Sequence, residues 1–175
     1  MSQINIIDKK VQIAGFNAEI VDLNELMDLI SVLVAENECG GCAIQLLNAD
    51  GIAGKKHVLQ AVSQALIAFN RNDNVAQDLG LEICVRASAQ RQISRALKIL
   101  GIKEGKMGIC AVTVDCDEKV MQRLNKIIGK KNLKVLDPNI GVLKKLYKIS
   151  NEEIKSAGTI ERVLIERTAL LSLKL

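Results

Sequence analysis

Apolar and polar residues alternate along the chain in patterns that predict short strands and amphipathic helices in turn. Alternating or short apolar runs predict strands at residues 4–7, 11–14, 43–47 and 107–114, the first two forming a hairpin around Asp8. Apolar residues three and four apart predict helices at residues 23–33, 58–69, 89–100, 118–128, 138–147 and 159–164, with a short one from residue 150. With 175 residues and 49% hydrophobic content, this order predicts an α+β fold. We expect a single domain over residues 1–175, a two-layer sandwich in which several helices cover a mixed β-sheet.

Two segments allow more than one interpretation. In residues 81–87, Leu81, Ile83 and Val85 alternate as in a strand, while Leu79, Ile83 and Ala87 fit a helix equally well. Residues 169–175 also alternate and carry four leucines. Because chain ends normally fray, this segment is either a strand tucked into the sheet or an apolar surface for a protein partner.

Two lysines and the chain's only histidine stand at the start of one predicted helix, at Lys55, Lys56 and His57. A helix N-terminus carries about half a positive elementary charge, so cations are unfavourable there and an anion such as phosphate is favoured. The preceding Gly51 and Gly54 do not have P-loop spacing, and the Ser/Thr of that motif is missing. The lysines therefore either hold a phosphate or are solvated residues of the first turn.

A second helix also opens with positive charge. Ser88 is placed to cap it and Gly101 to end it in a left-handed conformation, while Arg91, Arg95 and Lys98 share one face. Such a face is often only solvated. Two basic helix starts in one chain, however, favour a shared anionic partner.

Composition narrows the function further. Residues 1–54 hold two basic against eight acidic residues, while the rest of the chain is basic and brings the net charge to +4. Only two Phe and one Tyr are present, too few for a base-stacking RNA platform. No apolar run is long enough to span a membrane and no secretory signal is evident, so we expect a cytoplasmic protein.

Catalytic and metal-binding patterns are missing from the sequence. Its five cysteines, an odd number without a secretory signal, predict free thiols. Cys39 and Cys42 have CxxC spacing but lack a matching second pair, so we expect no metal. His57 beside two cations is unsuited to act as a general base. We therefore expect no catalytic residues, no cofactor and no enzyme activity.

Several segments together resemble one family. They run from Leu47 to Asp50, from Lys55 to Leu59, from Leu81 to Ile93, from Leu143 to Ser150, from Glu161 to Leu164 and from Ala169 to Leu171. In order and spacing they resemble the TPRKB family of small regulatory subunits of the KEOPS complex. The resemblance covers about residues 43–105 and 140–175.

The resemblance implies a non-catalytic subunit that binds the atypical kinase/ATPase of KEOPS and serves threonylcarbamoylation of adenosine next to the tRNA anticodon. It also implies recruitment of tRNA through the single-stranded 3′ CCA end. We place the tRNA contacts at Ile52, Lys55, Lys56, Arg86, Arg91, Arg95, Gly101 and Ile102, and the kinase-facing surface at Leu170, Leu171, Leu173 and Leu175. The alternative is a small-molecule or nucleotide-phosphate-binding domain, or an unrecognised enzyme of that kind, that uses Lys55 and Lys56.

Overall fold

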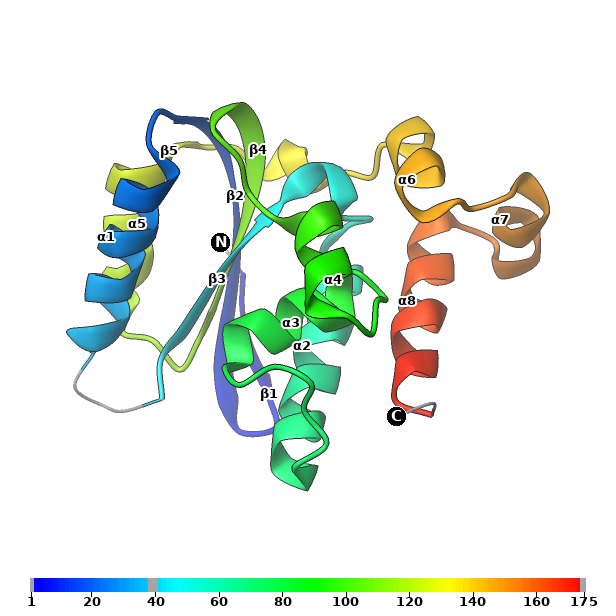
Figure 1. The fold of residues 1–175 in the computed structure, drawn as a ribbon, viewed down its shortest axis with the longest axis horizontal. Helices are drawn as coiled ribbons and strands as arrows, with labels where there is room; N and C mark the ends of the chain where they lie inside the picture. The colour runs from blue at the N-terminus through cyan, green and yellow to red at the C-terminus, as the bar shows by residue number, and fades with distance from the viewer. Residues whose placement is uncertain (1, 38–40, 174–175) are drawn as a thin grey trace. The chain divides into compact units, whose positions relative to one another are not determined.

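The computed structural model describes residues 2–37 and 41–173 and groups the chain into two compact units. Residues 1–49 and 102–135 form the first, which we call the sheet unit. Residues 50–101 and 136–175 form the second, the helical unit. The elements in Figure 1 confirm the α+β class. The single domain over residues 1–175 stays a prediction.

The sheet unit contains five strands, β1 (Ser2–Ile6), β2 (Lys9–Ile20), β3 (Ala43–Asn48), β4 (Gly105–Val114) and β5 (Gly129–Lys131). Their order is β1-β2-β4-β3, and β5 pairs with β2 beyond the end of β1. Every described pairing is antiparallel, so the mixed sheet that we predicted is wrong. The reason is the position of β4, which runs opposite to both β2 and β3 and separates these two like-directed strands.

Two helices pack on one face of this sheet. α1 (Leu23–Ala35) and α5 (Glu118–Ile128) lie side by side along the strands (Figure 1). Each begins where the sequence provides a carboxylate: the Asp22 side chain accepts from the Glu25 amide and the Asp117 side chain from the Lys119 amide. Their buried residues and the facing strand residues form one core, which includes Phe16, Leu33 and Leu124.

A disulfide joins Cys42 to Cys116 within the sheet unit, with 4.5 Å between the Cα atoms and a sequence separation of 74. The register explains the pairing: Ala43 opposes Val114, so the residues just before β3 and just after β4 are neighbours. The prediction that all five cysteines are free thiols is therefore wrong for this pair. Cys84 and Cys110 are free and buried, and Cys39 lies outside the described residues.

The helical unit is built from α2 (Lys55–Arg71), α3 (Leu79–Ala87), α4 (Ile93–Leu100), α6 (Ile140–Tyr147), α7 (Asn151–Ala157) and α8 (Ile160–Leu171). α2 packs against both α3 and α8. The ambiguous residues 81–87 are helical because the Asp78 carboxylate caps α3, accepting from the Leu81 amide at 2.8 Å. Two short 3-10 helices, η1 (Ala49–Gly51) and η2 (Leu133–Leu136), complete the described elements.

Two predicted helix starts are wrong. α4 begins at Ile93 rather than Ala89, because Ser88 ends α3 instead and donates its hydroxyl to the Val85 carbonyl. Gly101 is extended, not left-handed. α6 begins at Ile140 because the Asn139 side chain accepts from the Val142 amide, so Asp137 and Pro138 lie before the helix.

Candidate functional site

The predicted RNA-contacting residues do not all reach the surface. Ile52 and Arg86 are each 1% exposed, so their side chains are unavailable to RNA, contrary to a side-chain contact at either position. Gly101 lies against its own helix: a Cβ there would stand 2.3 Å from the Leu97 carbonyl oxygen. Ile102 belongs to the sheet unit and packs on that unit's core.

Arg91 and Arg95 line one groove of the helical unit, which we call the arginine groove. It has a volume of about 620 Å³ and is lined by Ala89, Gln90, Arg91, Gln92, Arg95, Arg167, Leu170 and Leu171. Arg91 precedes the first residue of α4 and Arg95 lies in its first turn. Both are exposed. Their guanidinium groups are therefore available for planar, bidentate contacts with phosphate or carboxylate.

Arg167, the third arginine of this groove, is already engaged. Its Nε and Nη2 donate to the two Glu153 carboxylate oxygens, each at 2.9 Å, and its Nη1 donates to the Tyr147 carbonyl at 2.8 Å. The carboxylate offsets its charge. The uncompensated positive charge of the groove therefore comes from Arg91 and Arg95.

The start of α2 has a carboxylate beside it. Gly54 precedes the helix with φ of 101°, a conformation that favours glycine, and a Cβ there would stand 2.5 Å from Glu161 Oε1. A negative group near a helix N-terminus is stabilising, so the chain itself supplies an anion at this position. Lys56 is exposed and Lys55 half-buried, which leaves both lysines accessible beside Glu161.

His57 is fully buried, and both of its ring nitrogens have backbone partners. Its Nδ1 accepts from the Ala53 amide at 3.2 Å and its Nε2 lies 2.8 Å from the Ala87 carbonyl. This arrangement requires the neutral ring with its proton on Nε2. Burial lowers the pKa of His57 to about 4.

We expect this histidine to make stability depend on pH. The folded pKa of about 4 lies below the ordinary 6.5, so the unfolded chain binds more protons between these values and stability falls as the pH drops from 6.5 toward 4. The slope from one proton is about 1.4 kcal/mol per pH unit. Urea unfolding at pH 7.5, 6 and 5 should show a weaker dependence for His57→Gln than for the wild-type chain. Equal slopes for the two proteins would contradict this prediction.

The second concave surface is an apolar groove between α2 and α8, about 670 Å³ in volume, which we call the α2–α8 groove. Its lining residues are Gln64, Ile67, Arg71, Glu166, Ala169, Leu170, Ser172 and Leu173. Leu170 is 47% exposed and Leu173 79%. Large apolar side chains this exposed around a groove are typical of a protein-docking surface. The sequence analysis missed the α2 side, whose signal was the i, i+3, i+7 spacing of Gln64, Ile67 and Arg71.

At the C-terminus the predicted strand is wrong, and the predicted kinase-facing leucines differ in their exposure. The chain remains helical to Leu171, so a strand over residues 169–175 is wrong. Leu171 is buried at 8% exposure, because it faces into the helical unit. Of the four predicted kinase-facing leucines, the structure therefore places Leu170 and Leu173 at the surface, while Leu175 lies outside the described residues.

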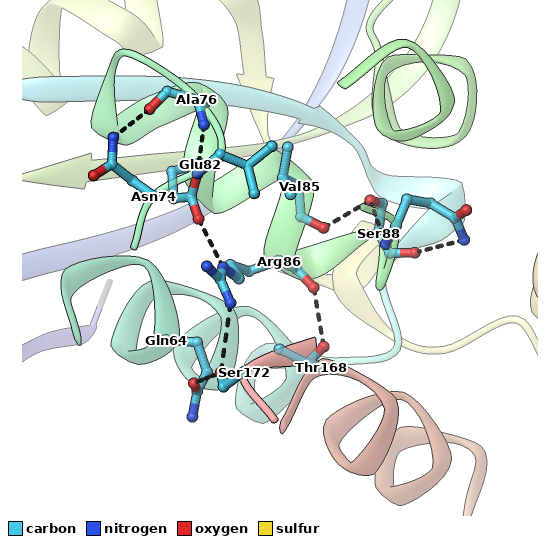
Figure 2. A network of polar contacts seen from close by, with 11 residues as sticks. Gln64, Asn74, Ala76, Glu82, Val85, Arg86, Ser88, Thr168 and Ser172 are labelled. Carbon is cyan, nitrogen blue, oxygen red and sulfur yellow. Dashed lines mark hydrogen bonds and ion pairs between the residues drawn. The ribbon is translucent and has the colours of Figure 1, made fainter. Parts of the chain in front are cut away.

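Beneath the α2–α8 groove, Arg86 and Glu82 form a buried ion pair, with 2.7 Å between Arg86 Nε and Glu82 Oε1 (Figure 2). Glu82 Oε2 also accepts from the amides of Val75 and Ala76, each at 2.8 Å. The Thr168 hydroxyl donates to the Arg86 carbonyl at 3.1 Å, which joins α8 to α3. Arg86 is therefore part of the interior of this unit.

Two further observations concern metal and membrane binding. Within residues 2–37 and 41–173, no three His, Cys, Asp or Glu side chains gather as metal ligands would. Every described helix falls short of the length and apolar character needed to cross a membrane.

Comparison with known proteins gives two matches. The family described as "Kinase binding protein CGI-121" matches residues 18–172. The chain is also 36% identical to "Regulatory protein Cgi121" of Methanocaldococcus jannaschii over 138 residues, which cover 77% of this chain and 86% of that protein. The family match covers every residue that lines the arginine groove and all of those that line the α2–α8 groove except Leu173.

Proposed function

The chain belongs to the CGI-121 family of kinase-binding proteins, and we propose from this that it binds the atypical kinase/ATPase subunit of KEOPS as a non-catalytic regulatory subunit. Membership of this family supports the proposal that the protein is a regulatory KEOPS subunit with a kinase partner. The proposed docking site is the α2–α8 groove, and the observation that supports it is the exposed apolar surface of Leu170 and Leu173. Apolar anchors in a desolvated pocket supply most of the affinity of many interfaces. We expect the protein to act in the cytoplasm.

Replacing Leu170 and Leu173 by aspartate should weaken kinase binding by more than about 100-fold, since each buried anchor contributes about 2 kcal/mol or more. Isothermal titration of the purified kinase subunit measures the effect. The matched control is Leu97→Asp, because Leu97 is 43% exposed but lines neither groove. Affinity unchanged in the double variant, or reduced equally by Leu97→Asp, would refute this docking site.

We further propose that the subunit recruits tRNA through its single-stranded 3′ CCA end, with Arg91 and Arg95 contacting phosphates. Both guanidinium groups are exposed and lack a partner among the described residues. Lys55 and Lys56, at the start of α2, are proposed as further phosphate contacts. The low aromatic content suits binding through charge and backbone contacts rather than through base stacking. The contacts predicted at Gly101 and Ile102 stay predictions.

Charge reversal at the arginine groove should lower tRNA affinity. The Arg91→Glu, Arg95→Glu variant should also reduce the slope of log affinity against log salt by about 0.7 for each phosphate that the protein no longer neutralises. The control is Lys130→Glu with Lys131→Glu, which changes the same charge in strand β5 of the sheet unit. Filter binding at two salt concentrations measures both quantities.

Trimming the CCA end from tRNA tests the recognition of the tail itself. We expect the wild-type chain to bind trimmed tRNA more weakly than intact tRNA, with a shallower salt slope. Equal affinity for the two would refute tail recognition. Saturable ATP binding that disappears in Lys55→Glu, Lys56→Glu would favour the alternative function of nucleotide-phosphate binding.

A further inference from the structure

In the Glu82–Arg86 pair, the carboxylate has a full set of hydrogen-bond partners and the guanidinium does not. The carboxylate accepts three hydrogen bonds, from Arg86 Nε and from the amides of Val75 and Ala76, all at 2.7–2.8 Å. The guanidinium makes only one short hydrogen bond in return, and its Nη1 reaches the Ser172 hydroxyl at 3.4 Å. Arg86 Nη2 is buried without a partner in the described part of the chain. A permanently charged group in this state favours a further acceptor.

A small cavity of about 40 Å³ lies beside this guanidinium. It is lined by Gln64, Ile67, Ala68, Arg71, Asp73, Arg86 and Ser172. About 10–15 Å³ of such space holds one water, so the cavity has room for about three heavy atoms, the size of a carboxylate group.

The cavity is continuous with the α2–α8 groove, because Gln64, Ile67, Arg71 and Ser172 line both. Ser172 lies between them: it accepts from Arg86 Nη1 and donates to the Gln64 side-chain oxygen (Figure 2). A group that enters the cavity from the groove therefore approaches Arg86 past this hydroxyl.

Charges of both signs surround the cavity. Arg86 is buried within it and Arg71 contributes a second guanidinium at its rim. The opposing carboxylates are Asp73, which is exposed at the rim, and Glu82, whose oxygens already accept hydrogen bonds and whose charge offsets that of Arg86. Glu166 lines the groove but not the cavity. A carboxylate in the cavity would lie beside the guanidinium groups of both Arg86 and Arg71.

We infer that this cavity receives the carboxylate of an aspartate or glutamate side chain from the protein that docks on the α2–α8 groove. The inference rests on the proposed function for the identity of that protein. Apolar neighbours of the acidic residue would cover Leu170 and Leu173, while the buried carboxylate fixes the register of the two surfaces. Charged groups in the desolvated centre of an interface act mainly on specificity in this way.

The carboxylate site is tested on the isolated chain with acetate as the probe. In ¹H–¹⁵N spectra of the wild-type protein, the Arg86 Nε–H signal and the Ser172 amide should shift saturably with acetate. Acetamide at equal concentration and sodium chloride at equal ionic strength should leave them unchanged. A linear, unsaturated response, or one equal to that of acetamide, would mean that the cavity holds only water and would overturn the inference.

The docking role is tested by filling the cavity. Ser172→Leu places apolar atoms at its entrance without removing Arg86, and should lower kinase affinity at least tenfold and abolish the acetate response. Ser156→Leu is the matched control, on an exposed position of α7. Equal kinase affinity for Ser172→Leu and wild type would overturn the inference and leave the proposed function intact. A wild-type chain that does not bind the kinase would refute the proposed function and the partner named here, while a saturable acetate response would still support the carboxylate site.

Discussion

Replacing Glu82 by alanine should lower the free energy of unfolding by about 4–5 kcal/mol. Removing one member of a buried ion pair typically costs about 3–5 kcal/mol, because the other charge stays buried without its partner. Here the variant also leaves the amides of Val75 and Ala76 without the acceptor that they meet at 2.8 Å. An effect this large is a substantial fraction of the total stability of a domain, which is about 5–15 kcal/mol. Urea unfolding followed by circular dichroism measures it.

Two other variants separate the contributions at this position. Glu82→Gln keeps an oxygen acceptor but removes the charge, so its effect should be smaller than that of alanine. The double variant Glu82→Leu, Arg86→Met replaces the pair with apolar side chains of similar size, and should recover a large part of the stability that Glu82→Ala removes. A loss below about 1.5 kcal/mol in Glu82→Ala, or a double variant less stable than Glu82→Ala, would contradict the assigned role of the pair.

Reduction of the Cys42–Cys116 disulfide should lower the free energy of unfolding by about 4 kcal/mol. The bond closes a loop with a sequence separation of 74 residues, and a loop of that length restricts the unfolded chain by roughly this amount in the chain-entropy treatment. Urea unfolding with and without dithiothreitol measures the difference. The m-value should rise on reduction, because the reduced unfolded chain exposes more surface.

The two free cysteines in the described part of the chain should not complicate this experiment. Burial raises the pKa of both Cys84 and Cys110 to about 12, so neither is an effective thiolate at neutral pH. The control is the Cys42→Ser, Cys116→Ser variant, whose stability should not respond to dithiothreitol. If the reduced and oxidised wild-type proteins unfold at the same urea concentration, the bond contributes nothing to stability.

Local signals in the sequence predicted most elements correctly. Asp22, Ser150 and Thr159 accept hydrogen bonds from amides three residues ahead, as their positions before apolar helical patterns indicated. The hairpin at β1 and β2 and the buried strands β3 and β4 were also predicted from short-range pattern. In each case the interacting groups are close in sequence, so the pattern contains the information.

The errors concern positions where local pattern allowed two structures. Ser88 was assigned to the helix that follows it, yet its hydroxyl bonds back to Val85. The alternating leucines at the C-terminus fit a strand, but Leu171 is buried in the helical unit and Thr168 bonds to the Arg86 carbonyl of α3. Tertiary contacts of this kind select the helix over a strand of equal local preference.

In the candidate site, too, some features could be predicted from the sequence and others could not. Arg91, Arg95, Leu170 and Leu173 are exposed as the sequence analysis expected. Arg86 was grouped with the surface cations because its charge gave no sign of the buried carboxylate four residues earlier. Nothing in the sequence singled out Ile67, which lines the α2–α8 groove.

The sequence by itself therefore determined the class of the fold, the order of its elements and the family, because helix caps, hydrophobic periods and motif spacing are local properties of the chain. Only the tertiary structure decided which cysteines pair, which cations are buried and which leucines form a groove. These features join residues far apart in sequence, such as Cys42 with Cys116 and Arg86 with Ser172. Burial and partnership depend on what packs against a side chain, and short-range pattern does not specify that.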